Sequence, residues 1–203
     1  MFTKQFKVEG DWKDVLNDCR ASVNKEPLDK EPSDQFKSSI LMAEHSPIRN
    51  LHIRWQWPNI PSWCATHWVR HMWYSLVSTQ RPDKTGKKRG DADAPVTFIG
   101  EANPQNLIDS WRKRLCFQAA PLTREYAEDF KWVSYQKEPH ISRVLVPNCI
   151  YRGGCPESKP CGFYDSFVKT YGQTSDLSLR YKQYEESFLK QRLTQHKKEE
   201  QDG

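Results

Sequence analysis

Four cationic side chains occur within one short stretch of the sequence, HWVRHMWYSLVSTQRPD, which spans residues 67–83. They are His67, Arg70, His71 and Arg81. Aromatic and hydroxyl-bearing residues separate them, and no carboxylate occurs before Asp83. Guanidinium groups that converge with hydroxyl donors, away from carboxylates, favour an anion, most simply a phosphate. The stretch therefore predicts an anion-binding site.

The elements around this stretch must position its side chains. Ser62 is expected to cap a helix that continues through residue 74, which would place four residues on one helical face: His67, Arg70, His71 and Tyr74. The following SLVSTQR is expected to be extended and to return three donors toward that helix: Ser78, Thr79 and Arg81. The alternative is an ordinary amphipathic helix whose cations are simply solvated.

Other stretches predict a mixture of strands and helices. LHIRWQW, residues 51–57, alternates apolar and polar side chains and predicts a strand with four inward residues: Leu51, Ile53, Trp55 and Trp57. A short strand is expected at residues 5–10. Two helix caps are expected, at Asp11 and at Ser33 or Asp34. A further helix begins near Pro121, with three residues expected in the core: Tyr126, Phe130 and Val133.

The composition suits a folded protein rather than a disordered chain. The sequence has 203 residues, a formal net charge of +5 and 12% aromatic residues. No run approaches the roughly 18 apolar residues of a membrane span, and the stretch MFTKQFKVEG lacks the apolar core of a signal peptide. We therefore expect an intracellular protein without a membrane partner. The mild basic excess permits an anionic ligand without requiring nucleic acid.

Two motifs carry a resemblance to a known family. The first resembles R-H-R-x-x-S-x-x-x-x-S-x-R-Y, with matches at Arg70, His71, Ser75, Thr79 and Arg81. The second, NPQNLIDSWRKRLCFQAAPLTR, resembles N-A-R-S-L followed by further arginines, with matches at Asn103, Leu107, Arg114, Ala119 and Arg124. Over about residues 6–164 the chain resembles the flavin-dependent thymidylate synthase family. It is most similar to a short, divergent branch from phage and gut-bacterial genomes.

The resemblance implies a fold and a reaction. The fold would be α+β, with a small antiparallel sheet packed with helices, in a homotetramer whose sites lie at subunit interfaces. Residues 1–174 would form this domain, and residues 175–203 would add a C-terminal helix and polar tail. The reaction would transfer a methylene group from methylenetetrahydrofolate to C5 of dUMP and reduce it with FAD, which NADPH recharges. The location would be the cytoplasm of a bacterial or phage-infected cell.

The resemblance also implies a role for each matched residue. Arg114 would polarise the pyrimidine carbonyl, Arg81 would act with it in catalysis, and Arg70 would bridge nucleotide and flavin. The substrate-binding set would be His67, Arg70, Thr79, Arg81, Arg89 and Arg114. Within it Thr79 and Arg81 would hold the phosphate, with Arg89 as an additional phosphate ligand. The flavin-binding set would be Ser46, Arg70, His71, Asn103 and Asp109.

Several positions depart from the family pattern and leave other functions open. They are Arg49, His67, Met72, Pro82, Gln105 and Asp109. The departures at Arg49, His67 and Met72 would accommodate the same flavin and folate chemistry directed to another product, such as hydroxymethylation of dUMP or dCMP for modified phage DNA. A hypothesis from another class is a non-catalytic protein that binds single-stranded nucleic acid through arginines and tryptophans. It is not favoured, because the basic residues form no block in the sequence.

Four cysteines raise a separate question. The stretch NCIYRGGCPESKPCGF, within a loop expected at residues 147–164, has the spacing C-x5-C-x5-C. With the cysteine of RKRLC it supplies four thiols: Cys116, Cys149, Cys155 and Cys161. In an intracellular protein such a set can form a structural Zn site. The spacing is not that of a standard zinc knuckle, and buried free cysteines are the alternative. A disulfide or a redox pair is less expected.

Overall fold

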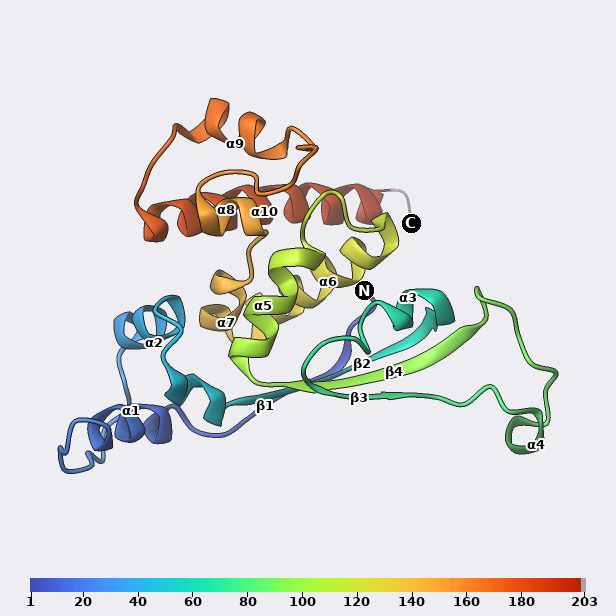
Figure 1. Cartoon of the computed structure of the whole chain (residues 1–203), viewed down its shortest axis with the longest axis horizontal. Helices are drawn as coiled ribbons and strands as arrows, with labels where there is room; N and C mark the ends of the chain where they lie inside the picture. Colours follow the sequence, from blue (N-terminus) through green and yellow to red (C-terminus); the bar gives the residue numbers. More distant parts are fainter. Residues whose placement is uncertain (202–203) are drawn as a thin grey trace.

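The computed structural model in Figure 1 has a four-stranded antiparallel sheet with most of its helices on one face. It describes the backbone of residues 1–201 and the side chains of residues 1–194. In sheet order the strands are β1 (Lys4–Glu9), β2 (His52–Pro61), β4 (Pro95–Ala102) and β3 (Tyr74–Val77). The predicted α+β class with a small antiparallel sheet is confirmed.

The inner face of the sheet is built from large aromatic residues. Trp55 and Trp57 of β2 are fully buried, as the alternating pattern of that strand predicts. Gly100 of β4 pairs with Trp55, and a Cβ atom at this glycine would lie 2.3 Å from the indole ring. Only a residue without a side chain therefore lets Trp55 lie flat across the sheet.

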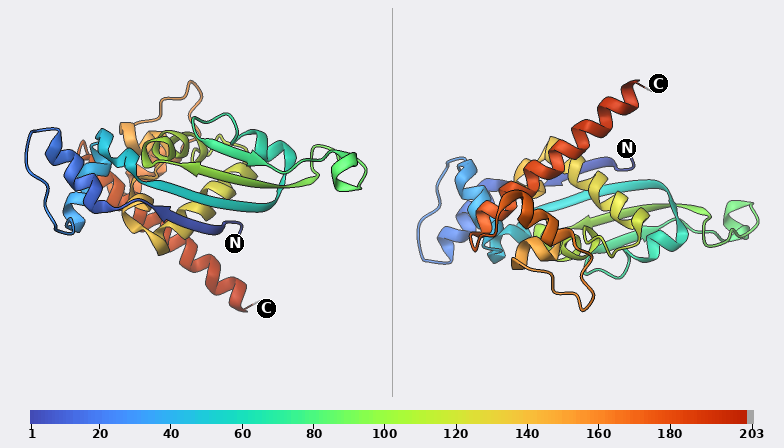
Figure 2. Two further views of the ribbon diagram at one scale, coloured as in Figure 1. Left: turned by 90° about the horizontal axis from the view of Figure 1, so that it is seen from below. Right: turned by 90° about the horizontal axis from the view of Figure 1, so that it is seen from above.

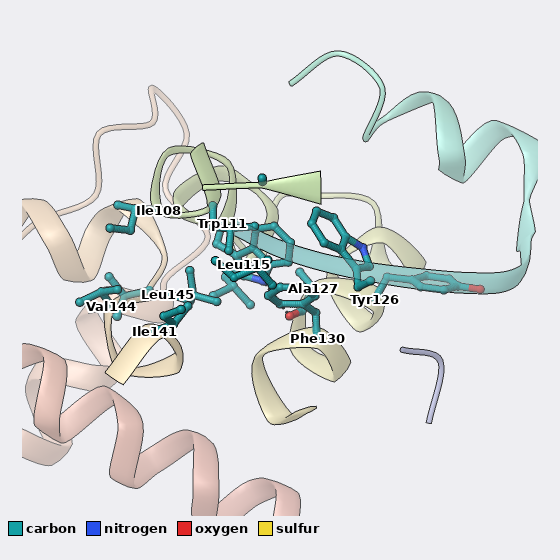
Figure 3. Packing of buried hydrophobic residues seen from close by; sticks show 14 of the residues in the cluster. Ile108, Trp111, Leu115, Tyr126, Ala127, Phe130, Ile141, Val144 and Leu145 are labelled. Atoms are coloured by element: carbon teal, nitrogen blue, oxygen red, sulfur yellow. Dashed lines mark hydrogen bonds between the residues drawn. The ribbon is translucent and has the colours of Figure 1, made fainter. Parts of the chain in front are cut away.

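Two layers of helices follow on this face (Figures 1 and 2). The first contains α5 (Pro104–Arg114), α6 (Pro121–Lys137) and α7 (Pro139–Val144). Beyond it lie α8 (Asn148–Arg152), α9 (Phe163–Tyr171) and α10 (Leu177–Gln201). Figure 3 shows side chains of the first layer packed together, among them Trp111 of α5 and Phe130 of α6, whose ring centroids lie 4.4 Å apart. The predicted core residues Tyr126, Phe130 and Val133 are buried.

The N-terminal helices lie beside one end of the sheet: α1 (Trp12–Ala21), α2 (Asp34–Met42) and the short 3-10 helix η1 (Ser46–Asn50). The first two begin where the sequence predicts, whereas η1 was not predicted. The Asp11 side chain caps α1 by accepting from the amide of Lys13, and Ser33 caps α2 by accepting from that of Phe36.

The predicted helix over residues 62–74 is wrong. The helix α3 spans only Ser62–Thr66; Pro61, and not Ser62, is its N-cap, and no side chain caps it. Successive turns follow, and β3 begins at Tyr74 because its residues pair with β4. Trp68, in the turns, is fully buried against Trp57, at a centroid distance of 4.7 Å. Burying this indole and starting the strand both require the helix to end early.

Three further regions differ in secondary structure from what the sequence predicts. The central strand β4 was missed, because its inward positions include Gly100 and Ala102, which weaken the apolar alternation. Residues 148–152 of the expected loop form α8. The expected polar tail is helical as far as Gln201. No helix in the described part of the chain is long and apolar enough to cross a membrane.

Candidate functional site

Arg114 lies at the C-terminal end of α5, where residues 67–73 hold its guanidinium. Its Nε donates to Nε2 of His71 at 3.0 Å, and its Nη2 donates to the backbone carbonyl of His67 at 2.6 Å. The guanidinium lies 5.9 Å from the ring centroid of Trp68. Since a guanidinium has five N–H donors, these two bonds leave others available to a ligand. Arg114 is therefore held in one orientation without being saturated.

The protonation state of His71 follows from this arrangement. Burial, together with the positive charges of Arg114 and Lys113, lowers its pKa to about 4. The ring is therefore neutral near pH 7, and because Nε2 accepts from Arg114, the proton must reside on Nδ1. His71 acts as a neutral acceptor that orients Arg114.

The cations beside Arg114 lack a matching number of carboxylates. Arg70, Lys113 and Arg114 line one cavity of about 380 Å³ together with His71 and a single carboxylate, Asp109. Burial and the charge of Arg70 lower the pKa of Arg114. Among the described residues, neither Arg70 nor Arg114 has an ion pair within 4 Å. Mutual repulsion between two such cations is relieved when an anion binds between them.

The second group of predicted residues lies on a segment after β3. Arg81 precedes the short helix α4 (Pro82–Thr85) and lines a cavity of about 430 Å³ with Arg89. The backbone amide of Arg81 donates to the Thr79 hydroxyl at 3.1 Å. The Arg81 guanidinium is exposed and binds both carboxylate oxygens of Asp83, at 3.0 and 2.6 Å. Two cations and a hydroxyl therefore gather here, with an aspartate already bound to one cation.

The fold keeps these two groups apart within one chain. The segment that contains α4 projects beyond the end of the sheet, away from α5, in all views of Figures 1 and 2. Arg114 lies instead at the end of α5, beside the indole ring of Trp68. The structure thus brings His67, Arg70, His71 and Arg114 together, but it does not bring Thr79, Arg81 or Arg89 to them.

The predicted flavin residues are distributed along α5. Asn103 caps its N-terminus by accepting from the amide of Asn106 at 3.0 Å, whereas His71 lies near its C-terminus. Eleven helical residues span about 16 Å. Ser46 begins η1, which packs against α5, and Asp109 lies between the two ends of the helix. These residues are therefore spread over the length of α5, and only His71, Asp109 and Arg70 line one cavity.

Two contacts that the sequence did not predict hold this region in place. His67 bonds through Nδ1 to the buried hydroxyl of Thr123 on α6, at 2.8 Å. Glu44 binds Arg112 of α5, whose guanidinium carbon also lies 3.5 Å from the ring centroid of Tyr151. Neither Thr123 nor Glu44 is a matched position of the two motifs. Only the fold reveals that both position α5 and the turns around His67.

The four predicted cysteine ligands line one cavity of about 510 Å³, next to Arg114. All are free thiols. Burial, with a smaller contribution from the neighbouring Cys116 and Cys155, raises the pKa of Cys149 to about 12. In the described part of the chain, no group of three or more His, Cys, Asp or Glu side chains has an arrangement that holds a metal ion as it stands. The expected zinc site therefore stays a prediction.

Comparisons with known proteins add no assignment to this geometry. The chain matches no model of a known protein family and no curated protein.

Proposed function

We propose that this chain is a flavin- and folate-dependent transferase that adds a one-carbon unit to C5 of a pyrimidine deoxynucleotide, by default converting dUMP to dTMP. One observation carries the proposal. Arg70 and His71 belong to one matched motif and Arg114 to the other, and the three side chains line the same cavity although some 40 residues separate them. Two cations in that cavity have no ion pair among the described residues, as an anionic substrate requires.

Arg114 would act on the pyrimidine. When C5 becomes nucleophilic, negative charge develops on the adjacent carbonyl oxygen, and a cation held beforehand stabilises that charge without reorganising. His71 and the carbonyl of His67 hold the guanidinium, and its remaining N–H groups are available to the ring. Because His71 is neutral, it supports Arg114 without adding a competing charge.

Arg81, Thr79 and Arg89 would bind the nucleotide phosphate from a neighbouring subunit of a homotetramer. Their segment lies away from Arg114 in one chain, so a complete site needs residues from two chains. The edge strand β3 supports such an assembly, because Tyr74, Leu76 and Val77 are exposed on it. On phosphate binding, Arg81 would exchange Asp83 for the ligand.

The flavin would lie along α5. FAD carries an anionic diphosphate, and Arg70 and Lys113 supply positive charge in the cavity near the C-terminal end of that helix. Ser46, Asn103 and Asp109 would complete the binding residues, within a flavin-dependent thymidylate synthase-like fold. A bound flavin would supply hydride chemistry for the one-carbon transfer, with NADPH as its reductant. The protein groups would bind, orient and exclude water around it.

The visible absorption spectrum of the purified protein tests this proposal. We expect flavin bands, or their appearance on adding FAD, and a shift of these bands with dUMP or dCMP. Turnover with methylenetetrahydrofolate and NADPH should then yield a product whose mass separates a methyl from a hydroxymethyl group. The Arg114→Ala variant should bind flavin but turn over about 100- to 1,000-fold more slowly, whereas Arg20→Ala, on helix α1, should behave as wild type. A colourless protein that ignores FAD and binds single-stranded nucleic acid would contradict the proposal.

A further inference from the structure

The cavity beside Arg114 contains an unusual concentration of thiols. Four of the six cysteines in the chain line it, and they come from three separate places in the sequence. Cys116 follows α5, Cys149 lies in α8, and Cys155 and Cys161 lie in the connection between α8 and α9. The remaining two, Cys19 and Cys64, lie on other elements. The fold therefore gathers thiols that the sequence spaces widely.

The connection at residues 153–162 has little to hold it in place. It contains no helix or strand, and both of its ends are glycines with left-handed backbones, Gly153 at φ +70° and Gly162 at φ +80°. Its ends are anchored: Gly153 and Gly154 donate to the carbonyl of Cys149, and Ser166 donates to that of Gly162. Between them, at residues 155–161, one hydrogen bond to a described residue outside the connection is present, from the Gln118 amide to the carbonyl of Lys159. A segment of this kind is often fixed by a crosslink or a metal rather than by its own core.

The charges around the thiols fit a metal–thiolate centre. Four thiolates and one Zn²⁺ carry a net charge of −2, and three arginines and one lysine line the same cavity: Arg112, Lys113, Arg114 and Arg152. Glu157 is the one carboxylate among the lining residues. Two of the arginines already have partners, because Arg112 binds Glu44 and Arg152 binds Asn148. Arg114 lines both this cavity and the one that it shares with Arg70.

We propose that Cys116, Cys149, Cys155 and Cys161 bind one zinc ion in a closed, tetrahedral thiolate site. Binding converts four thiols to thiolates, releases four protons and forms four Zn–S bonds, with no change in oxidation state. The thiols do not stand in that arrangement, so the connection at residues 153–162 moves inward when zinc binds. Thiolate ligands select zinc among abundant divalent ions, whereas Mg²⁺ and Ca²⁺ prefer oxygen.

Such a site would link the connection at residues 153–162 to the residues around Arg114. Cys116 follows Arg114 by two residues, just beyond the end of α5. A zinc ion there would fix the end of this helix and fasten the connection between α8 and α9 over it. The role is structural, and it is separate from the proposed transfer reaction.

Metal analysis of the purified full-length protein tests the site. We expect about one zinc ion per chain in wild type and in the matched control Cys19→Ser, and at least a tenfold loss in the double variant Cys155→Ser/Cys161→Ser. Metal-stripped wild type should bind Co²⁺ with the intense near-ultraviolet absorption of cobalt–thiolate bonds.

Two results would overturn the proposal even if the double variant fails to fold. One is wild-type protein that is purified without zinc and whose stripped form gives no cobalt–thiolate absorption. The other is iron with the visible absorption of an iron–sulfur cluster in place of zinc. Zinc retained in a folded double variant would contradict the assignment of these ligands.

Discussion

Arg114 and Arg81 have the same guanidinium but contrasting surroundings. Arg114 is half-buried beside indole rings and is oriented by two bonds to residues 67 and 71. Arg81 is exposed on a projecting segment and binds a neighbouring aspartate, Asp83. A held cation suits transition-state stabilisation, and an exposed cation with an exchangeable partner suits ground-state binding. The comparison suggests that one region performs chemistry and the other captures substrate.

Removing the held cation should have the largest effect. We expect Arg114→Ala to lower kcat by about 100- to 1,000-fold with a small change in KM, because the lost interaction forms mainly in the transition state. Arg114→Lys should recover little, since a lysine cannot donate to His71 and the His67 carbonyl in the same fork geometry. Steady-state kinetics measures both. A large rise in KM with unchanged kcat would assign Arg114 to binding instead.

Disturbing the packing of Trp55 against β4 should lower the free energy of unfolding. In Gly100→Ala the new methyl group would meet the ring of Trp55 at 2.3 Å, so we expect the free energy of unfolding to fall by about 2–3 kcal/mol. Gly154→Ala is the matched control, since no atom lies within 4 Å of the position that its methyl group would take and its backbone is not left-handed. Urea denaturation of both variants makes the comparison. Equal stability would show that the sheet shifts to accept the methyl group.

Removing the exposed cation should affect binding more than chemistry. Arg81→Ala should raise KM for the nucleotide by about 10- to 100-fold, the value of one or two bonds to a charged group, with little change in kcat. Asp83→Asn should lower KM a few-fold, because the phosphate would no longer compete with a carboxylate. If Asp83→Asn raised KM as much as Arg81→Ala, the aspartate would be orienting the arginine rather than competing for it.

The smallest expected effect is a change in acid stability. His71 has a folded-state pKa of about 4 against an ordinary value of 6.5, so the unfolded chain binds an extra proton between these values and stability falls as pH falls from 6.5 to 4. His71→Gln keeps an acceptor for Arg114 but does not titrate. Allowing for partial exposure, it should lose about 1–2 kcal/mol less unfolding free energy than wild type between pH 7 and pH 4. An unchanged pH dependence would argue against the neutral state.

Strong local patterns predicted much of this fold. The alternation around Trp55 and Trp57 and the caps at Asp11 and Ser33 were correct, because each depends on neighbouring residues alone. The helix through residues 67–74 was wrong, because burial of Trp68 and pairing of β3 with β4 are long-range requirements that override a 3.6-residue pattern.

The candidate site was predictable only as a set of residues. Motif matches named Arg70, His71 and Arg114, and the structure brings them together. Motifs could not indicate that Arg81 lies on a separate segment, or that Thr123 holds His67, because both depend on how distant elements pack. The division of the site into two regions is thus information that the fold adds.

Subunit mixing tests the central claim most directly. At low nucleotide concentration, Arg114→Ala and Arg81→Ala protein should each have at most about a tenth of the wild-type activity. After the two are unfolded, mixed and refolded together, each complete site would need one intact arginine from each kind of subunit, and activity should recover to about a quarter of the wild-type value. Mixed protein that stays as inactive as the separate variants would contradict a site shared between the Arg114 region of one chain and the Arg81 segment of another.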